Sequence, residues 1–80
     1  MQPKEKIHII RDNLRAYADD IKGTGTIKGT FYYAALGEIA VYDKFLNGFD
    51  LDKDEQQFIE DALNFDKIIY GKHIFIFRGG

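Results

Sequence analysis

The spacing of apolar residues changes once along the chain, close to residue 66. Before that point, apolar residues recur every three or four positions, which is the period of an α-helix that buries one side. After it, residues 67–70 and 73–78 are rich in β-branched and aromatic side chains, and Gly71-Lys72 lies between them. Two such runs with a two-residue turn predict a β-hairpin. The sequence therefore predicts helices followed by a C-terminal hairpin, which is an α+β fold.

The first helix is expected from about Lys4 to Ile21. Its apolar stripe has alternating spacings of three and four, formed by Ile7, Ile10, Leu14, Tyr17 and Ile21. Pro3 suits the start of a helix, where its missing N–H is not needed. Gly23 follows the pattern and is a natural stop.

Residues 23–30 contain three glycines and predict a short strand with turns at its ends. Thr30 then suits the cap of a second helix over residues 31–47, which has apolar residues on two sides. A helix of that kind is usually central in its domain. Glycine weakens a helix interior, so Gly37 predicts a close contact with another element.

A third helix is expected from about Lys53 to Asn64, because Asp52 and Glu55 have the spacing of a capping box. The predicted elements are thus three helices, one short strand and a C-terminal β-hairpin. Their order of helix, strand, helix, helix, hairpin resembles that of winged-helix domains. The resemblance concerns element order alone, and it implies a DNA-binding regulator as one expectation.

Size and composition limit the chemistry of the chain. Its 80 residues form a single domain, residues 1–80, with a core built from seven Phe and five Tyr. The absence of Cys excludes disulfides, thiolate metal sites and cysteine nucleophiles, and the absence of Ser excludes a serine triad. The N-terminal stretch lacks the apolar run of a signal peptide, so a cytoplasmic location is expected.

Negative charge is concentrated in one segment. Residues 48–66 carry one lysine and seven carboxylates, a net charge of -6, whereas residues 67–80 carry +3 and the whole chain carries -2. This acidic segment includes the third helix, which a winged-helix domain would insert into the major groove. Because phosphates would repel it, we do not expect this helix to read DNA directly.

The leading hypothesis is a non-enzymatic module that presents an acidic helix to a basic protein. Such a face complements a basic surface and accelerates encounter with it. Basic surfaces belong mostly to proteins that handle nucleic acid. In size and charge the chain is similar to phage-encoded inhibitors of restriction and CRISPR systems, and this implies a nucleic-acid mimic. The expected partner-binding residues are Asp54, Glu55, Glu60, Asp61 and Tyr33.

Three alternatives stay open. The carboxylates could serve solubility alone. The hairpin could contact DNA phosphates through its basic residues, which are Lys67, Lys72, His73 and Arg78. The chain ends in Gly79-Gly80, and this tail is similar to that of ubiquitin-like modifiers and sulfur carriers, which implies a carrier whose terminal carboxylate is adenylated. The helical first half departs from that family, which begins with strands.

No metal, cofactor or catalytic activity is expected. Asp50, Asp52 and Asp54, with Asp61 beyond them, resemble a calcium-binding EF-hand loop, but Glu55 stands where that loop requires glycine. The capping box accounts for the same residues. The glycine-rich stretch has no preceding strand, which a dinucleotide-binding loop requires. The two histidines are not in metal-ligand spacing with each other or with a carboxylate.

Overall fold

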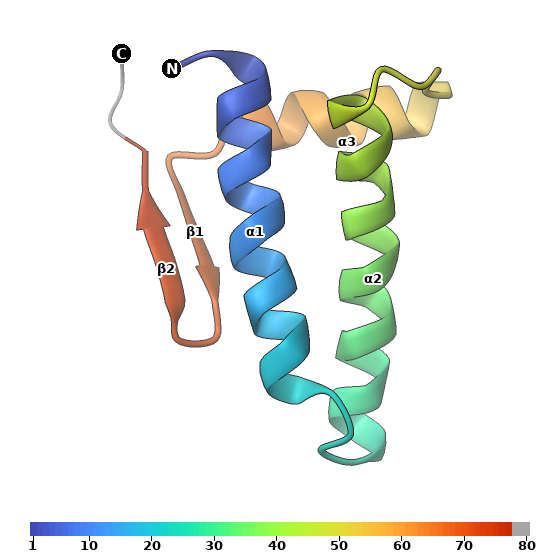
Figure 1. Ribbon diagram of the computed structural model, residues 1–80, viewed down its shortest axis with the longest axis vertical. Helices are drawn as coiled ribbons and strands as arrows, with labels where there is room; N and C mark the ends of the chain where they lie inside the picture. The colour runs from blue at the N-terminus through green and yellow to red at the C-terminus, as the bar shows by residue number, and fades with distance from the viewer. Residues whose placement is uncertain (78–80) are drawn as a thin grey trace.

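The computed structural model contains three helices followed by one antiparallel hairpin (Figure 1). It describes residues 1–77, apart from the side chains of residues 26 and 27. The elements are α1 (Pro3–Ile21), α2 (Thr26–Leu46), α3 (Lys53–Leu63), β1 (Lys67–Tyr70) and β2 (His73–Ile76). The expected α+β fold is confirmed, and so are the three helices and the hairpin.

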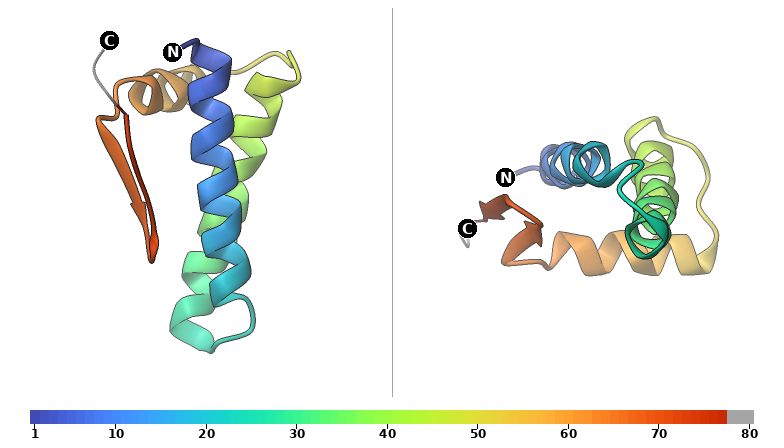
Figure 2. Two further views of the ribbon diagram at one scale, coloured as in Figure 1. Left: turned by 60° about the vertical axis from the view of Figure 1, so that its left-hand side comes forward. Right: turned by 90° about the horizontal axis from the view of Figure 1, so that it is seen from below.

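Helix α1 is the central element of the domain. Its backbone lies close to α2, α3 and both strands, whereas the backbone of α2 lies close to α1 and α3 but not to the hairpin. Figures 1 and 2 show α1 and α2 side by side and antiparallel, with α3 crossing both near the start of α1 and the hairpin beside α1. The core therefore forms where α1 is enclosed by the other elements.

The apolar stripe of α1 provides one side of this core. The buried residues of the helix are Ile7, Ile10, Leu14, Ala18 and Ile21. Four of them belong to the predicted stripe, and the fifth stripe residue, Tyr17, is half-buried. Pro3 begins the helix as expected. The spacing of three and four thus identified the side of α1 that faces the other elements.

The short strand predicted within residues 23–30 is absent, and α2 begins at Thr26 instead of following Thr30. A strand needs a neighbour to satisfy its backbone, and the hairpin lies on the other side of α1. A helix satisfies the same groups internally, and the Gly29 N–H donates to the Gly25 carbonyl at 2.8 Å. Without the strand, the order of elements matches a winged-helix domain only loosely.

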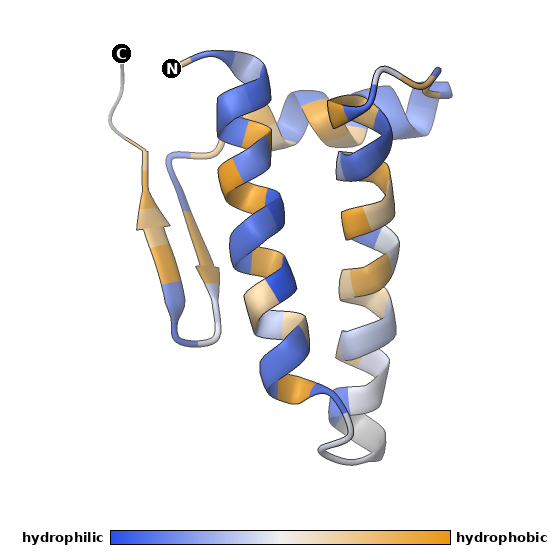
Figure 3. Cartoon of the chain, in the orientation of Figure 1, coloured by the Kyte–Doolittle hydropathy of each residue, from blue (hydrophilic) through white to orange (hydrophobic). Residues whose placement is uncertain are grey.

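Helix α2 lies at the side of the domain, so the prediction that it would be central is wrong. Figure 3 shows that its middle is mostly apolar or intermediate, whereas hydrophilic residues recur along α1. Part of this apolar surface faces outward, including Phe31 and Tyr33. A side chain at Gly37 would meet nothing within 4 Å, so the close contact expected there is also absent.

Helix α3 begins with the predicted capping box. The Asp52 carboxylate accepts from the Glu55 N–H at 2.8 Å, and the Glu55 carboxylate accepts from the Asp52 N–H at 3.0 Å. The helix ends at Leu63, one residue earlier than expected. Its buried residues, Ile59 and Ala62, join the core beside α1 and α2.

The hairpin turns at Gly71-Lys72, as predicted, and pairs Ile68 with Phe75 and Tyr70 with His73 on the side that faces the helices. Gly71 has φ +58°, and a Cβ there would lie 3.0 Å from the Tyr17 ring, so both conformation and space require glycine. The outer side carries three exposed isoleucines, which are Ile69, Ile74 and Ile76. Within residues 1–77, no helix has the combination of length and apolar character needed to cross a membrane.

Candidate functional site

The carboxylates of α3 point in different directions and do not form one continuous face. Successive residues of an α-helix are rotated by about 100°. Asp54 and Asp61 are therefore close together around the axis, Glu55 is turned toward the buried side, and Glu60 is about 100° away from Asp61. Asp54, Glu60 and Asp61 are exposed, whereas Glu55 is half-buried. The structure thus separates the four predicted acidic residues into three positions.

Glu55 is neutralised within the chain. Its carboxylate accepts a hydrogen bond from the Lys44 ammonium of α2 at 2.7 Å, in addition to its role in the capping box. The hydrogen bond from Lys44 holds the pKa of the Glu55 carboxyl below its ordinary value, and the same bond raises the pKa of Lys44. Glu55 therefore acts as a contact between α2 and α3.

Asp54 and Asp61 form what we call the acidic flank of α3. They stand four residues before and three residues after Phe58, so all three side chains occupy one side of the helix. The Phe58 ring packs on the Tyr42 ring of α2, with centroids 5.0 Å apart. The acidic flank therefore borders the part of α2 that contains Tyr42. Gln57 donates a hydrogen bond to the Asp61 carboxylate at 2.9 Å and does not change its charge.

Tyr33 is not brought together with these carboxylates. The Tyr33 side chain on α2 is 72% exposed. Its ring meets the Tyr32 ring edge-on, with ring centroids 5.4 Å apart. It precedes Tyr42 by nine residues, which corresponds to about 13 Å along the helix axis. Tyr33 is exposed, but it lies away from the end of α2 that α3 crosses.

The structure points to one further carboxylate, on α2. Glu38 of α2 is half-buried, and it lies one helical turn before Tyr42. It forms no hydrogen bond or ion pair with any described residue. The sequence did contain a signal for it, because Glu38 is the only charged residue between Lys28 and Asp43.

The charge of Glu38 affects two tyrosines. These are Tyr42 of α2 and Tyr70 of β1, whose side chains interact with each other. Burial raises the pKa of Tyr42 far above its ordinary value, and the charges of Tyr70 and Glu38 raise it further. Burial and the charge of Glu38 also raise the pKa of Tyr70. Burial alone raises the pKa of the Glu38 carboxyl.

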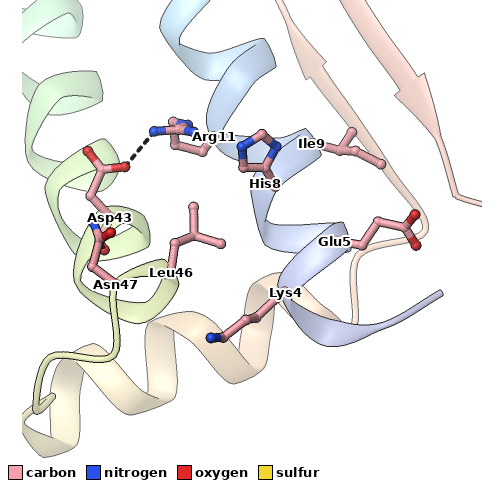
Figure 4. A pocket seen from close by; sticks show the side chains of 8 residues that line it. All are labelled: Lys4, Glu5, His8, Ile9, Arg11, Asp43, Leu46 and Asn47. Carbon is pink, nitrogen blue, oxygen red and sulfur yellow. Dashed lines mark hydrogen bonds and ion pairs between the residues drawn. The ribbon is translucent and has the colours of Figure 1, made fainter.

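A surface pocket lies elsewhere, between the first turns of α1 and the last turns of α2 (Figure 4). It has a volume of about 580 Å³. Across it, Arg11 donates a hydrogen bond to Asp43 at 2.7 Å, so these two charges neutralise each other. The residues that line it are Lys4, Glu5, His8, Ile9, Arg11, Asp43, Leu46 and Asn47. None of the five predicted binding residues is among them.

The hairpin offers a small basic surface. Lys67 and Lys72 are exposed, but the outer side between them carries the three isoleucines. His73 is half-buried, and its Nε2 lies 2.6 Å from an Asp20 oxygen. Arg78 and the Gly79-Gly80 tail lie outside the described residues, so the carrier hypothesis stays a prediction.

No group of three or more metal-binding side chains occurs in the described part of the chain. Comparison of the chain with protein-family models, with curated proteins and with solved structures finds no match.

Proposed function

We propose that this protein acts by binding, and that the acidic flank of α3 docks on a basic protein surface. One observation carries the proposal. Asp54 and Asp61 are exposed on the same side of a short rigid helix, and no lysine, arginine or histidine of the described chain forms an ion pair with either. Two unpaired carboxylates held in fixed positions favour encounter with a complementary partner.

Charges elsewhere support the choice of this flank. The lysine of α2 that faces α3, Lys44, is occupied by Glu55. The other helices pair several of their charges internally, as Arg11 does with Asp43. Glu38 of α2, one helical turn before Tyr42, is a further carboxylate without an ion pair among the described residues. The flank therefore keeps its two negative charges, although the net charge of the chain is only -2.

The charges of the flank support a finer proposal, that it imitates nucleic acid. Asp54 and Asp61 are two helical turns apart, about 10 Å along the axis, so they present two negative charges at defined positions, as a polyanion does. A partner whose basic residues bind phosphates would accept these carboxylates. Phage-encoded inhibitors of restriction or CRISPR systems are the proposed class.

The test neutralises the flank without changing its shape. The paired substitution Asp54→Asn and Asp61→Asn is expected to weaken binding to the captured partner about tenfold, which corresponds to ~1.4 kcal/mol. The partner is first captured from a nuclease-treated lysate with the wild-type chain, and affinities are then measured by surface plasmon resonance at two salt concentrations. The wild-type interaction is expected to weaken with salt.

A matched control has the same change in net charge. Asp19→Asn with Asp66→Asn removes two exposed carboxylates of α1 and the α3–β1 connection. This variant should bind like the wild type. Equal weakening by both pairs would show that overall charge governs binding, and no weakening by the flank pair would leave the flank without a role. Either result contradicts the proposed function.

A further inference from the structure

A chain of neighbouring side chains connects Glu38 of α2 with β1 and α1. Tyr42 lies one turn further along α2, Tyr70 comes from β1, and Tyr17 of α1 packs against Tyr70 with ring centroids 6.3 Å apart and planes tilted by 34°. We call these four residues the Glu38 site. Glu38, Tyr17 and Tyr70 are each half-buried, so they keep part of their surface accessible. The acidic flank borders the same site through Phe58 and Tyr42.

The Glu38 site has an unmet electrostatic requirement. A carboxylate that is partly removed from water is stabilised by a cation or by hydrogen-bond donors. Neither is supplied to Glu38 by the described residues, and the nearby His73 is engaged with Asp20. A positive group from outside the chain would therefore satisfy Glu38.

We propose that the Glu38 site receives an arginine side chain of the basic partner. The guanidinium would pair with the Glu38 carboxylate while its plane lies against the exposed part of the Tyr17 and Tyr70 rings. Arginine fits because it combines two donors for a carboxylate with a flat cation that stacks on aromatic rings. This inference rests on the proposed function and assigns it a specific anchor next to the acidic flank.

Other cations fit the site less well. A calcium ion takes six to eight oxygen ligands, and the site offers one carboxylate and three hydroxyls. A lysine ammonium would pair with Glu38 but has no flat surface for stacking. Burial raises the pKa of Glu38, and a bound guanidinium would lower it again because it stabilises the charged carboxylate.

The test is a titration of the isotope-labelled protein with Nα-acetyl-arginine amide, followed by NMR. Saturable shifts are expected at the ring signals of Tyr17 and Tyr70 and at the Glu38 carboxylate carbon, whose titration midpoint should move to lower pH. The Glu38→Gln variant should bind about tenfold more weakly, because a charge-assisted hydrogen bond contributes ~1.5 kcal/mol or more. Nα-acetyl-lysine amide should bind the wild type more weakly than the arginine probe.

Glu60→Gln is the matched control, since it makes the same chemical change on the other side of α3 and should leave the titration unchanged. Folding of Glu38→Gln is checked by its melting temperature. Since burial raises the folded pKa of Glu38, the ionised carboxylate destabilises the fold above its ordinary pKa of 4.5. The variant should therefore melt higher than the wild type near pH 7 and equally at pH values well below 4.5.

The outcomes separate the two proposals. Absence of saturable shifts at Tyr17 and Tyr70 in the wild type overturns the arginine site, and so does equal binding by Glu38→Gln or by the lysine probe. The proposed function is tested separately, by partner binding of the Asp54→Asn, Asp61→Asn variant. If this variant binds the partner more weakly, the proposed function stands even when the arginine site is overturned. If it binds the partner as well as the wild type does, the proposed function is contradicted.

Discussion

Replacing Ile10 with alanine is expected to lower the melting temperature of the domain by about 10–30 °C. Ile10 is 0% exposed and belongs to the core cluster between α1 and the other elements. Removing its larger side chain leaves a cavity and should destabilise the fold by about 2–5 kcal/mol. A domain of this size has a total stability of about 4–12 kcal/mol, so the loss is a large fraction of the total.

The measurement is thermal unfolding followed by far-UV circular dichroism. Ile74→Ala is the matched control, because Ile74 is 59% exposed on the outer side of the hairpin. Its effect should stay within about 0.5 kcal/mol of the wild type. If the two variants melted at the same temperature, the core would not be centred on α1 as described.

Replacing Lys6 with methionine is expected to destabilise the domain by about 2 kcal/mol. The Lys6 ammonium of α1 donates to the backbone carbonyls of Leu63 at 2.8 Å and Phe65 at 2.6 Å. Leu63 is the last residue of α3, and Phe65 lies just beyond it. It also lies 4.6 Å from the centre of the Phe77 ring. Methionine keeps the apolar stem but leaves these carbonyls without the charged donor.

Urea unfolding measures this effect, with Lys4→Met as the control. Lys4 is exposed, two residues earlier in the same helix, and makes no hydrogen bond or ion pair with the described residues. Its substitution should change the unfolding free energy by less than about 0.5 kcal/mol. Equal stabilities of the two variants would mean that Lys6 does not hold α3 against α1.

Local sequence patterns predicted most of the fold. The spacing of the α1 stripe, the capping box of Asp52 and Glu55, and the Gly71-Lys72 turn each depend on residues close in sequence. All three are present in the structure. In each case the predicted element packs against a neighbouring element in the structure, so the local preference of the sequence agrees with the tertiary packing.

The short strand predicted within residues 23–30 was wrong because the prediction used local sequence alone. Their glycines and threonines tolerate an extended conformation, but a strand there would have no neighbouring strand. Whether a neighbour exists is a property of the whole fold and cannot be read from eight residues. The central position assigned to α2 was wrong in the same way, because its second apolar side remains partly exposed at Phe31.

The candidate site was predictable only in part. The sequence identified α3 as acidic, but it did not show that Lys44 neutralises Glu55, because that pair depends on where α3 crosses α2. The separation of Glu60 from Asp61 follows from helix geometry alone and was overlooked. Glu38 was overlooked because it is a single charge in an apolar helix, and such a residue gains meaning only when Tyr42 and Tyr70 are placed beside it.

The most direct test of the central claim is to map which carboxylates of the chain touch the captured partner. Zero-length carbodiimide cross-linking joins carboxylates to lysines in contact, and mass spectrometry identifies each pair. The account predicts cross-links from Asp54 and Asp61 to lysines of the partner. Cross-links confined to other exposed carboxylates, such as Asp12 and Asp19 on α1, would contradict it.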